Sequence, residues 1–174
     1  MSRAFVKDGA PEAPPIIPPR APLPDGVANY VTPRGLRLLR EEREALEAER
    51  SRLGASEAGD AAADRKRALQ VVAGRLAALS ARIARSQLVE PRGTPDAVRF
   101  GTTVEAETEA GELRRIQIVG VDEAEPAVGR VAFVSPIARA LVGTRVGGTA
   151  VLATPQGERR LTVTRISYDA PPVE

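Results

Sequence analysis

Two acidic residues and a basic cluster stand where one long helix is expected to reverse into another. The stretch RLGASEAGDAAADRKR, residues 52–67, holds two acids three positions apart and then three consecutive basic residues: Glu57, Asp60, Arg65, Lys66 and Arg67. Carboxylates at the start of a helix accept hydrogen bonds from its free amides and interact favourably with its dipole. Carboxylate oxygens are also hard ligands that suit Mg²⁺. The sequence therefore leaves two roles open for the acids, capping the second helix or assisting a metal.

The basic cluster has two interpretations as well. Arginine and lysine are the side chains that neutralise nucleic-acid phosphates. The alternative is a solvated helix face, balanced by the glutamates of the preceding helix: Glu41, Glu42, Glu44, Glu47 and Glu49. Surface ion pairs of that kind contribute little to stability.

Composition excludes most common enzyme classes. The 174 residues include no cysteine and no histidine, so thiol nucleophiles, imidazole acid–base chemistry and the usual zinc sites are absent. The formal net charge is only +2, so any electrostatic role must come from local asymmetry. No apolar run approaches the roughly 20 residues that a bilayer requires, which favours a cytoplasmic protein.

Two amphipathic helices are predicted between residues 30 and 90. Thr32 is suited to cap the first helix, with Pro33 at its first position. Leucines then recur at spacings of three and seven, and the second helix repeats its apolar residues by three and four: Leu36, Leu39, Leu46, Leu53, then Leu69, Val72, Leu76, Leu79 and Ile83. Stripes this narrow are buried only against each other, which predicts an antiparallel coiled-coil hairpin that folds back near Asp60, with arms of about 40 Å.

Strand patterns follow the helices. β-Branched residues alternate with polar ones in VRFGTTVEAE, LRRIQIVG, RVAFV, AVLAT and RRLTVTRI, and turns are predicted at Gly111 and Gly157. SPIARALVG interrupts them as one short helix, with Ser135 as cap, Pro136 at the first position and Gly143 at the end. The predicted fold class is α+β, a helical hairpin followed by a small antiparallel sheet domain with one short helix.

Three segments are expected. Residues 1–29 carry seven of the prolines and are predicted to be a disordered tail, because proline lacks an amide donor. Residues 30–90 form the hairpin, and residues 97–169 form the sheet domain.

Several motifs together resemble one known family. NYVTPRGLRLL, LVEP, VRFGTTV, RIQIVGVDEAEP and above all SPIARALVGTRVG resemble the bacterial Gre family of transcript cleavage factors, its GreB-like branch in particular. The resemblance implies an FKBP-like second domain, and a coiled coil that enters the secondary channel of RNA polymerase. It implies cleavage of backtracked RNA by the polymerase itself, so the protein is not an enzyme.

The resemblance also implies roles for individual residues. Glu57 and Asp60 would help to hold a Mg²⁺ shared with the polymerase active site, with no cofactor or metal site of the protein's own. Arg65, Lys66 and Arg67 would lie near the 3′ end of the nascent RNA. Ser135, Pro136 and Arg139 would contact core RNA polymerase.

The tip departs from the family pattern, which leaves a second function open. Ala55 stands where the family has an aspartate, and the hairpin is shorter than is usual. A regulator that occupies the channel without supporting cleavage is therefore the alternative, and an adaptor unrelated to transcription is a third. Aromatic residues make up only 3% of the chain, which argues against a prolyl isomerase pocket, and no DNA recognition helix stands out. We expect a monomer without membrane contact.

Overall fold

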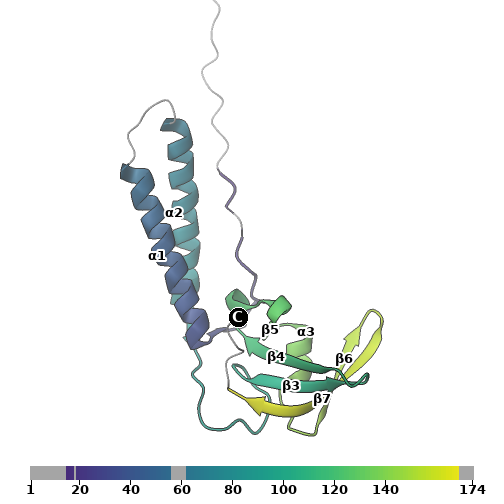
Figure 1. The fold of residues 1–174 in the computed structure, drawn as a ribbon. Helices are drawn as coiled ribbons and strands as arrows, with labels where there is room; N and C mark the ends of the chain where they lie inside the picture. The colour runs from purple at the N-terminus through teal and green to yellow at the C-terminus, as the bar shows by residue number, and fades with distance from the viewer. Residues whose placement is uncertain (1–14, 18, 56–61, 169–174) are drawn as a thin grey trace, which may run out of the picture.

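Two long helices dominate the first half of the protein. The computed structural model describes residues 15–17, 19–55 and 62–168. Helices α1 (Pro33–Ala55) and α2 (Ala62–Ala84) lie side by side and run in opposite directions, forming an arm that projects from the rest of the molecule (Figure 1). With 23 residues each, the two helices span about 35 Å. The predicted fold-back near Asp60 lies outside the described residues.

The cap predicted for α1 is confirmed. The backbone amide of Gly35 donates a hydrogen bond to Thr32 Oγ1 at 2.9 Å, and Pro33 is the first helical residue. Proline suits this position because its missing amide would have no partner within the helix. The chain therefore enters the arm at a defined residue.

The predicted apolar stripes form the core of the arm. Its fully buried members come from both helices and from the strand before α1: Val31, Leu39, Leu46, Val72, Leu76 and Leu79. Leu36, Leu53 and Ile83 pack against this cluster while remaining partly exposed. None of these residues belongs to the core of the sheet domain, so the arm has a separate hydrophobic core.

A short parallel sheet, which the sequence did not predict, joins the segment before α1 to the segment after α2. Strand β1 (Asn29–Val31) precedes α1 and pairs with strand β2 (Ser86–Leu88), which follows α2. Val89 extends the pairing by donating its amide to the carbonyl oxygen of Val31 at 2.9 Å. Both helix ends are thereby held together at the base of the arm.

The second half of the protein is a five-stranded sheet in the order β5-β4-β3-β7-β6. Its strands agree with the five predicted segments: β3 (Thr103–Thr108), β4 (Leu113–Val119), β5 (Arg130–Ala132), β6 (Thr149–Thr154) and β7 (Gly157–Ser167). The turns at Gly111 and Gly157 both form, and both glycines have positive φ angles. The chain is thus an α+β protein, and none of its described helices is long and apolar enough to cross a membrane.

One strand corrects the predicted antiparallel sheet. β5 pairs with β4 in parallel, whereas the pairs β3–β4, β3–β7 and β6–β7 are antiparallel. The connection between β4 and β5 contains two short 3₁₀ turns, η1 (Val121–Glu123) and η2 (Pro126–Val128), which bring the chain back beside Gln117 in the second half of β4. Gly129 completes the return with φ 79°, and a Cβ atom there would collide with the carbonyl oxygen of Arg115.

Helix α3 (Pro136–Leu141) covers the sheet. Ala138 and Leu141 are fully buried from this helix and join a core made mainly by β3, β4 and β7, including Val104, Ile118 and Val163. Gly143 ends the helix with φ 87° and donates its amide to Val98 at 2.8 Å. The buried residues of α3 therefore hold the segment SPIARAL against the sheet.

Part of the tail predicted over residues 1–29 contacts the arm and the sheet domain. Residues 19–28 form no helix or strand, as the prolines require, but Arg20 makes ion pairs with α1 and η1, and Asn29 belongs to β1. Proline removes backbone donors but leaves the neighbouring side chains free to bond. Residues 1–14 and 18 lie outside the described residues.

Candidate functional site

The predicted acidic pair falls, in the sequence, between the last described residue of α1 and the first of α2. Glu57 and Asp60 fall outside the described residues, which resume at Ala62, so their capping and metal roles stay predictions. In the described part of the chain, no three potential metal ligands lie close together. The end of α1 and the start of α2, which flank these acids in the sequence, both lie away from the sheet domain (Figure 1).

The predicted basic cluster occupies the first turns of α2. Arg65 is half-buried, whereas Lys66 and Arg67 are exposed. Consecutive residues in a helix point about 100° apart, so the three side chains do not share one face. The cluster therefore fans around part of α2 near its first turn rather than forming a flat patch.

The predicted docking residues are brought together by α3. Ser135 Oγ accepts a hydrogen bond from the amide of Ala138 at 3.3 Å, so it caps the helix. Pro136 and Arg139 are both exposed and three positions apart, which places them on one face. Val142, 51% exposed, extends this surface and was missed from the sequence, because an apolar residue at a helix end usually indicates core.

Removing the cap on α3 is expected to destabilise the sheet domain modestly. The change Ser135→Ala deletes the acceptor for the Ala138 amide, which costs about 1 kcal/mol for a typical cap. Urea denaturation followed by circular dichroism measures this loss. Ser51→Ala is the matched control, because Ser51 is exposed and bonds only to the preceding helical turn. Equal stability of the two variants would contradict the capping role.

Two adjacent acids in η1 join the arm to the sheet domain. The side chain of Glu123 is only 2% exposed, receives a hydrogen bond from Thr32 and forms an ion pair with Arg34 at 3.0 Å. Both partners lie at the start of α1. The same Thr32 hydroxyl therefore caps the helix and connects it to the sheet domain.

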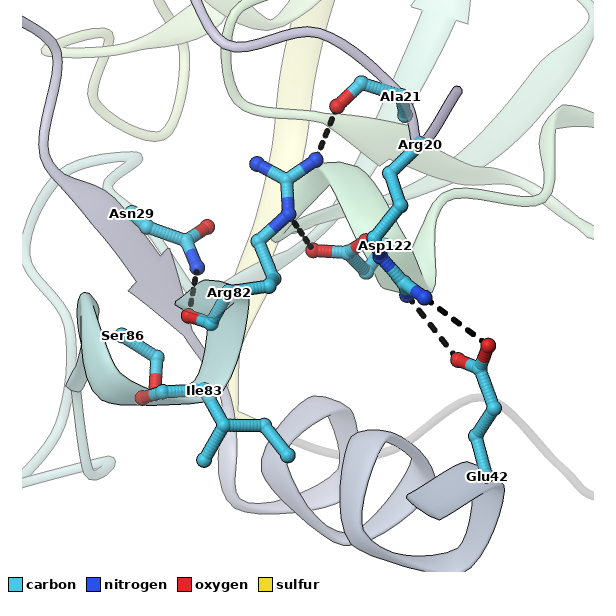
Figure 2. Close-up of polar contacts among 8 residues, drawn as sticks. All are labelled: Arg20, Ala21, Asn29, Glu42, Arg82, Ile83, Ser86 and Asp122. Carbon is cyan, nitrogen blue, oxygen red and sulfur yellow. Dashed lines mark hydrogen bonds and ion pairs between the residues drawn. The ribbon is translucent and has the colours of Figure 1, made fainter. Parts of the chain in front are cut away.

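The other acid of η1, Asp122, pairs with α2 and with the N-terminal segment. Its side chain is 7% exposed and pairs with Arg82 of α2 through Oδ2 at 3.1 Å and with Arg20 through Oδ1 at 3.0 Å (Figure 2). Arg20 also pairs with Glu42 of α1. Sequence reasoning missed this network, although the paired acids in VDEAEP and the lone arginine among prolines were visible signals.

Three aromatic rings pack against one another at the base of the arm. Tyr30, Phe100 and Phe133 contact one another, with ring centroids 5.6–5.7 Å apart. Tilted and edge-to-face contacts at this distance are favourable. Gly120 allows the close approach, because a Cβ there would lie 2.7 Å from the carbonyl oxygen of Tyr30. The junction is therefore packed as well as charge-paired.

The sheet domain has a groove of about 720 Å³ without an aromatic lining. Its walls include Ile116, Ile137 and Leu161, with Arg114 and Arg159 among the charged side chains. The tyrosine and the two phenylalanines of the junction contact one another and do not line this groove.

The fold and the site define a class of protein, one that carries a charged segment on a slender arm anchored to a compact domain. Residues 93–168 match the family model for the C-terminal part of the transcription elongation factors GreA and GreB. GreB of Neisseria meningitidis is 30% identical over 154 residues, covering 80% of this chain and 94% of that protein. GreA of Verminephrobacter eiseniae is 41% identical over 113 residues, covering 63% of this chain and 69% of that protein. The chain belongs to the GreA/GreB family.

Solved structures of related proteins cover most of the chain. The Gfh1 protein of Thermus thermophilus, a GreA factor homolog, covers 80% of this chain and 99% of its own at 22% identity and a TM-score of 0.37. The GreA/GreB factor of Nitrosomonas europaea covers 82% and 99% at 17% identity and a TM-score of 0.39. Superpositions this loose add no detail to the fold described above.

Proposed function

We propose that this protein binds core RNA polymerase at its secondary channel and promotes cleavage of backtracked nascent RNA. The observation that carries the proposal is the arm, whose two helices bury their apolar stripes against each other and against Val31 of β1, and extend away from the sheet domain. An arm of about 35 Å that shares no core residue with the sheet domain can be inserted into another molecule without unfolding. Membership of a family of transcription elongation factors supports the choice of polymerase as that molecule.

The tip is assigned the chemical role. Glu57 and Asp60 act as oxygen donors beside the catalytic centre of the polymerase, a donor set that suits Mg²⁺. A second Mg²⁺ bound there would activate water for hydrolysis of the RNA. Arg65, Lys66 and Arg67 neutralise phosphates at the 3′ end of the nascent RNA. The protein itself brings no cofactor and is not an enzyme, since the reacting bond and the pocket belong to the polymerase.

The sheet domain is assigned the anchoring role. We assign it an FKBP-like fold without isomerase activity, and Ser135, Pro136 and Arg139 contact the rim of the channel. The exposed face formed by Pro136 and Arg139, with Val142 beside it, offers both charge and apolar area to a partner. The protein acts as a cytoplasmic monomer, with the three segments 1–29, 30–90 and 97–169 serving as extension, probe and anchor.

Transcript cleavage tests the proposal directly. Added to backtracked elongation complexes, the protein is expected to release short 3′ fragments faster than the polymerase does alone. Glu57→Ala together with Asp60→Ala is expected to return the rate to the intrinsic level, because the donors are lost. Asp64→Ala is the matched control, because Asp64 is an exposed acid in the first turn of α2, and this variant should keep full activity. Cleavage that survives the double change would show that other acids act.

A second candidate function is favoured by the tip sequence. Ala55, the last described residue of α1, stands where the Gre family pattern has an aspartate. With one donor fewer, the protein would occupy the channel and inhibit or modulate transcription without hydrolysis. Co-migration with core polymerase combined with no cleavage above the intrinsic rate would select this function.

A further inference from the structure

Two short N-terminal stretches contact the arm. We call Ile17 together with residues 19–21 the strap. A Cβ atom at Gly74, in the middle of α2, would collide with Cδ1 of Ile17 and lie 3.0 Å from its Cγ1. Glycine is among the least favourable residues inside a helix, so its presence here calls for a reason. The space it leaves open is occupied by the side chain of Ile17.

Arg20 of the strap bridges the arm and the sheet domain. Its two terminal nitrogens bind both carboxylate oxygens of Glu42 on α1, at 2.9 and 3.0 Å. Another edge of the same guanidinium binds Asp122 Oδ1 of η1, from Nη2 at 3.0 Å and from Nε at 3.3 Å (Figure 2). Arginine alone has a planar fork of five donors that can serve two carboxylates at once.

The network closes on itself through α2. Arg82 pairs with Asp122 Oδ2 at 3.1 Å and also donates to the carbonyl oxygen of Ala21 in the strap. The side chains of Asp122, Arg82 and Arg20 are only 7%, 12% and 22% exposed. Hydrogen bonding to Glu42, opposed by burial and reinforced by Asp122, raises the pKa of Arg20 above its usual value. The guanidinium therefore stays charged wherever the protein is folded.

The position of the bridge along α1 determines what it can do. The contacts of Glu123 hold the first turn of α1, at Thr32 and Arg34, where they oppose a tilt only weakly. Glu42 lies eight residues beyond Arg34, about 12 Å further along the helix axis. A contact at Glu42 therefore resists a tilt of the arm more strongly than one at the first turn of α1, because it acts further from the junction.

We propose that Arg20 is a positioning residue: by bridging Glu42 to Asp122, the strap fixes the direction in which the arm projects from the sheet domain. A tilt of about 10° at the base would move the end of the arm by about 6 Å. Metal coordination tolerates far less, since Mg²⁺–oxygen distances are about 2.0–2.1 Å. The consequence for RNA cleavage rests on the proposed function, whereas the direction of the arm does not.

The distance between two labels measures the direction of the arm in the free protein. Because the chain has no cysteine, spin labels attach only at introduced positions, here Arg50→Cys on α1 and Leu113→Cys on β4, both exposed. Arg20→Ala is expected to broaden the distance distribution, with Arg20→Lys between it and the parent. Arg37→Ala is the matched control, since Arg37 forms only an exposed pair with Glu41 on the same helix. An unchanged distribution in Arg20→Ala would overturn the proposal.

A second variant separates positioning from loss of fold. Gly74→Ala keeps every charge and improves helix propensity, but it displaces Ile17. Gly54→Ala, with nothing within 4 Å of the added Cβ, is its control. A broader distribution in Gly74→Ala alone supports the strap, because a stabilised helix cannot broaden it by unfolding. Should Arg20→Ala lose helical circular dichroism, an unchanged distribution in Gly74→Ala overturns the proposal.

The cleavage assay connects the strap to the polymerase. Arg20→Ala is expected to bind core polymerase as the parent does and to cleave backtracked RNA several-fold more slowly. Equal cleavage rates in the two proteins would overturn the link between arm direction and activity. If the parent protein itself gives no cleavage, the proposed function fails, while the label distances still decide the positioning role.

Discussion

Replacing Leu79 by alanine is expected to lower the free energy of unfolding of the arm by about 2–5 kcal/mol. Leu79 is 0% exposed and belongs to a cluster of six buried residues that includes Leu39 and Leu46 of the facing helix. A cluster this thin has few neighbours that can move into the cavity. The loss should therefore fall toward the upper end of the range.

Urea denaturation followed by the helical circular dichroism signal measures the effect of Leu79→Ala. Leu113→Ala is the matched control, because Leu113 is 72% exposed and its removal should change stability by less than about 0.5 kcal/mol. Since the arm and the sheet domain share no core residue, the amide protection of Val163 in β7 should be unaffected. Equal losses at positions 79 and 113 would contradict the buried arm core.

Replacing Asp122 by alanine is expected to cost about 2 kcal/mol. Removing one partner of a fully buried ion pair costs about 3–5 kcal/mol, because the remaining charge is left without compensation. Here Arg82 and Arg20 are left behind, and their 12% and 22% exposure lets water recover part of that loss. The estimate is reduced accordingly.

Thermal unfolding compares Asp122→Ala with a matched exposed acid. Asp96 also pairs with two arginines, Arg99 at 3.0 Å and Arg145 at 3.9 Å, but its side chain is 71% exposed. Exposed pairs contribute about 0–1 kcal/mol, so Asp96→Ala should change stability little. A loss at Asp122 no larger than that at Asp96 would show that the junction does not depend on the buried charge.

Local patterns were enough to predict most of the elements. Thr32 with Pro33 and Ser135 with Pro136 marked two helix starts, and both are confirmed. These signals act within four residues, where capping and backbone geometry are decided by the sequence itself. The strand segments and the turns at Gly111 and Gly157 were predictable for the same reason.

Contacts between distant residues were not predictable. β1 and β2 have three residues each, too few for alternation to show, and their partners Asn29 and Ser86 are far apart in sequence. The parallel pairing of β5 depends on how η1 and η2 fold, and the ion pairs of Arg20 depend on where α1 and η1 meet. Periodicity describes one element at a time. Of the candidate site, the sequence gives the position of α3 and its cap, but the roles of Glu57 and Asp60 stay predictions.

The aromatic cluster makes the junction visible to spectroscopy. The chain contains two tyrosines and no tryptophan, and Tyr30 contacts Phe100 and Phe133 where the arm meets the sheet domain. The ultraviolet emission of tyrosine is therefore not masked by tryptophan, and one of the two tyrosines in the sequence lies at the junction. A swing of the helices would change the surroundings of that phenol, so the molecule carries its own optical reporter and needs no added dye.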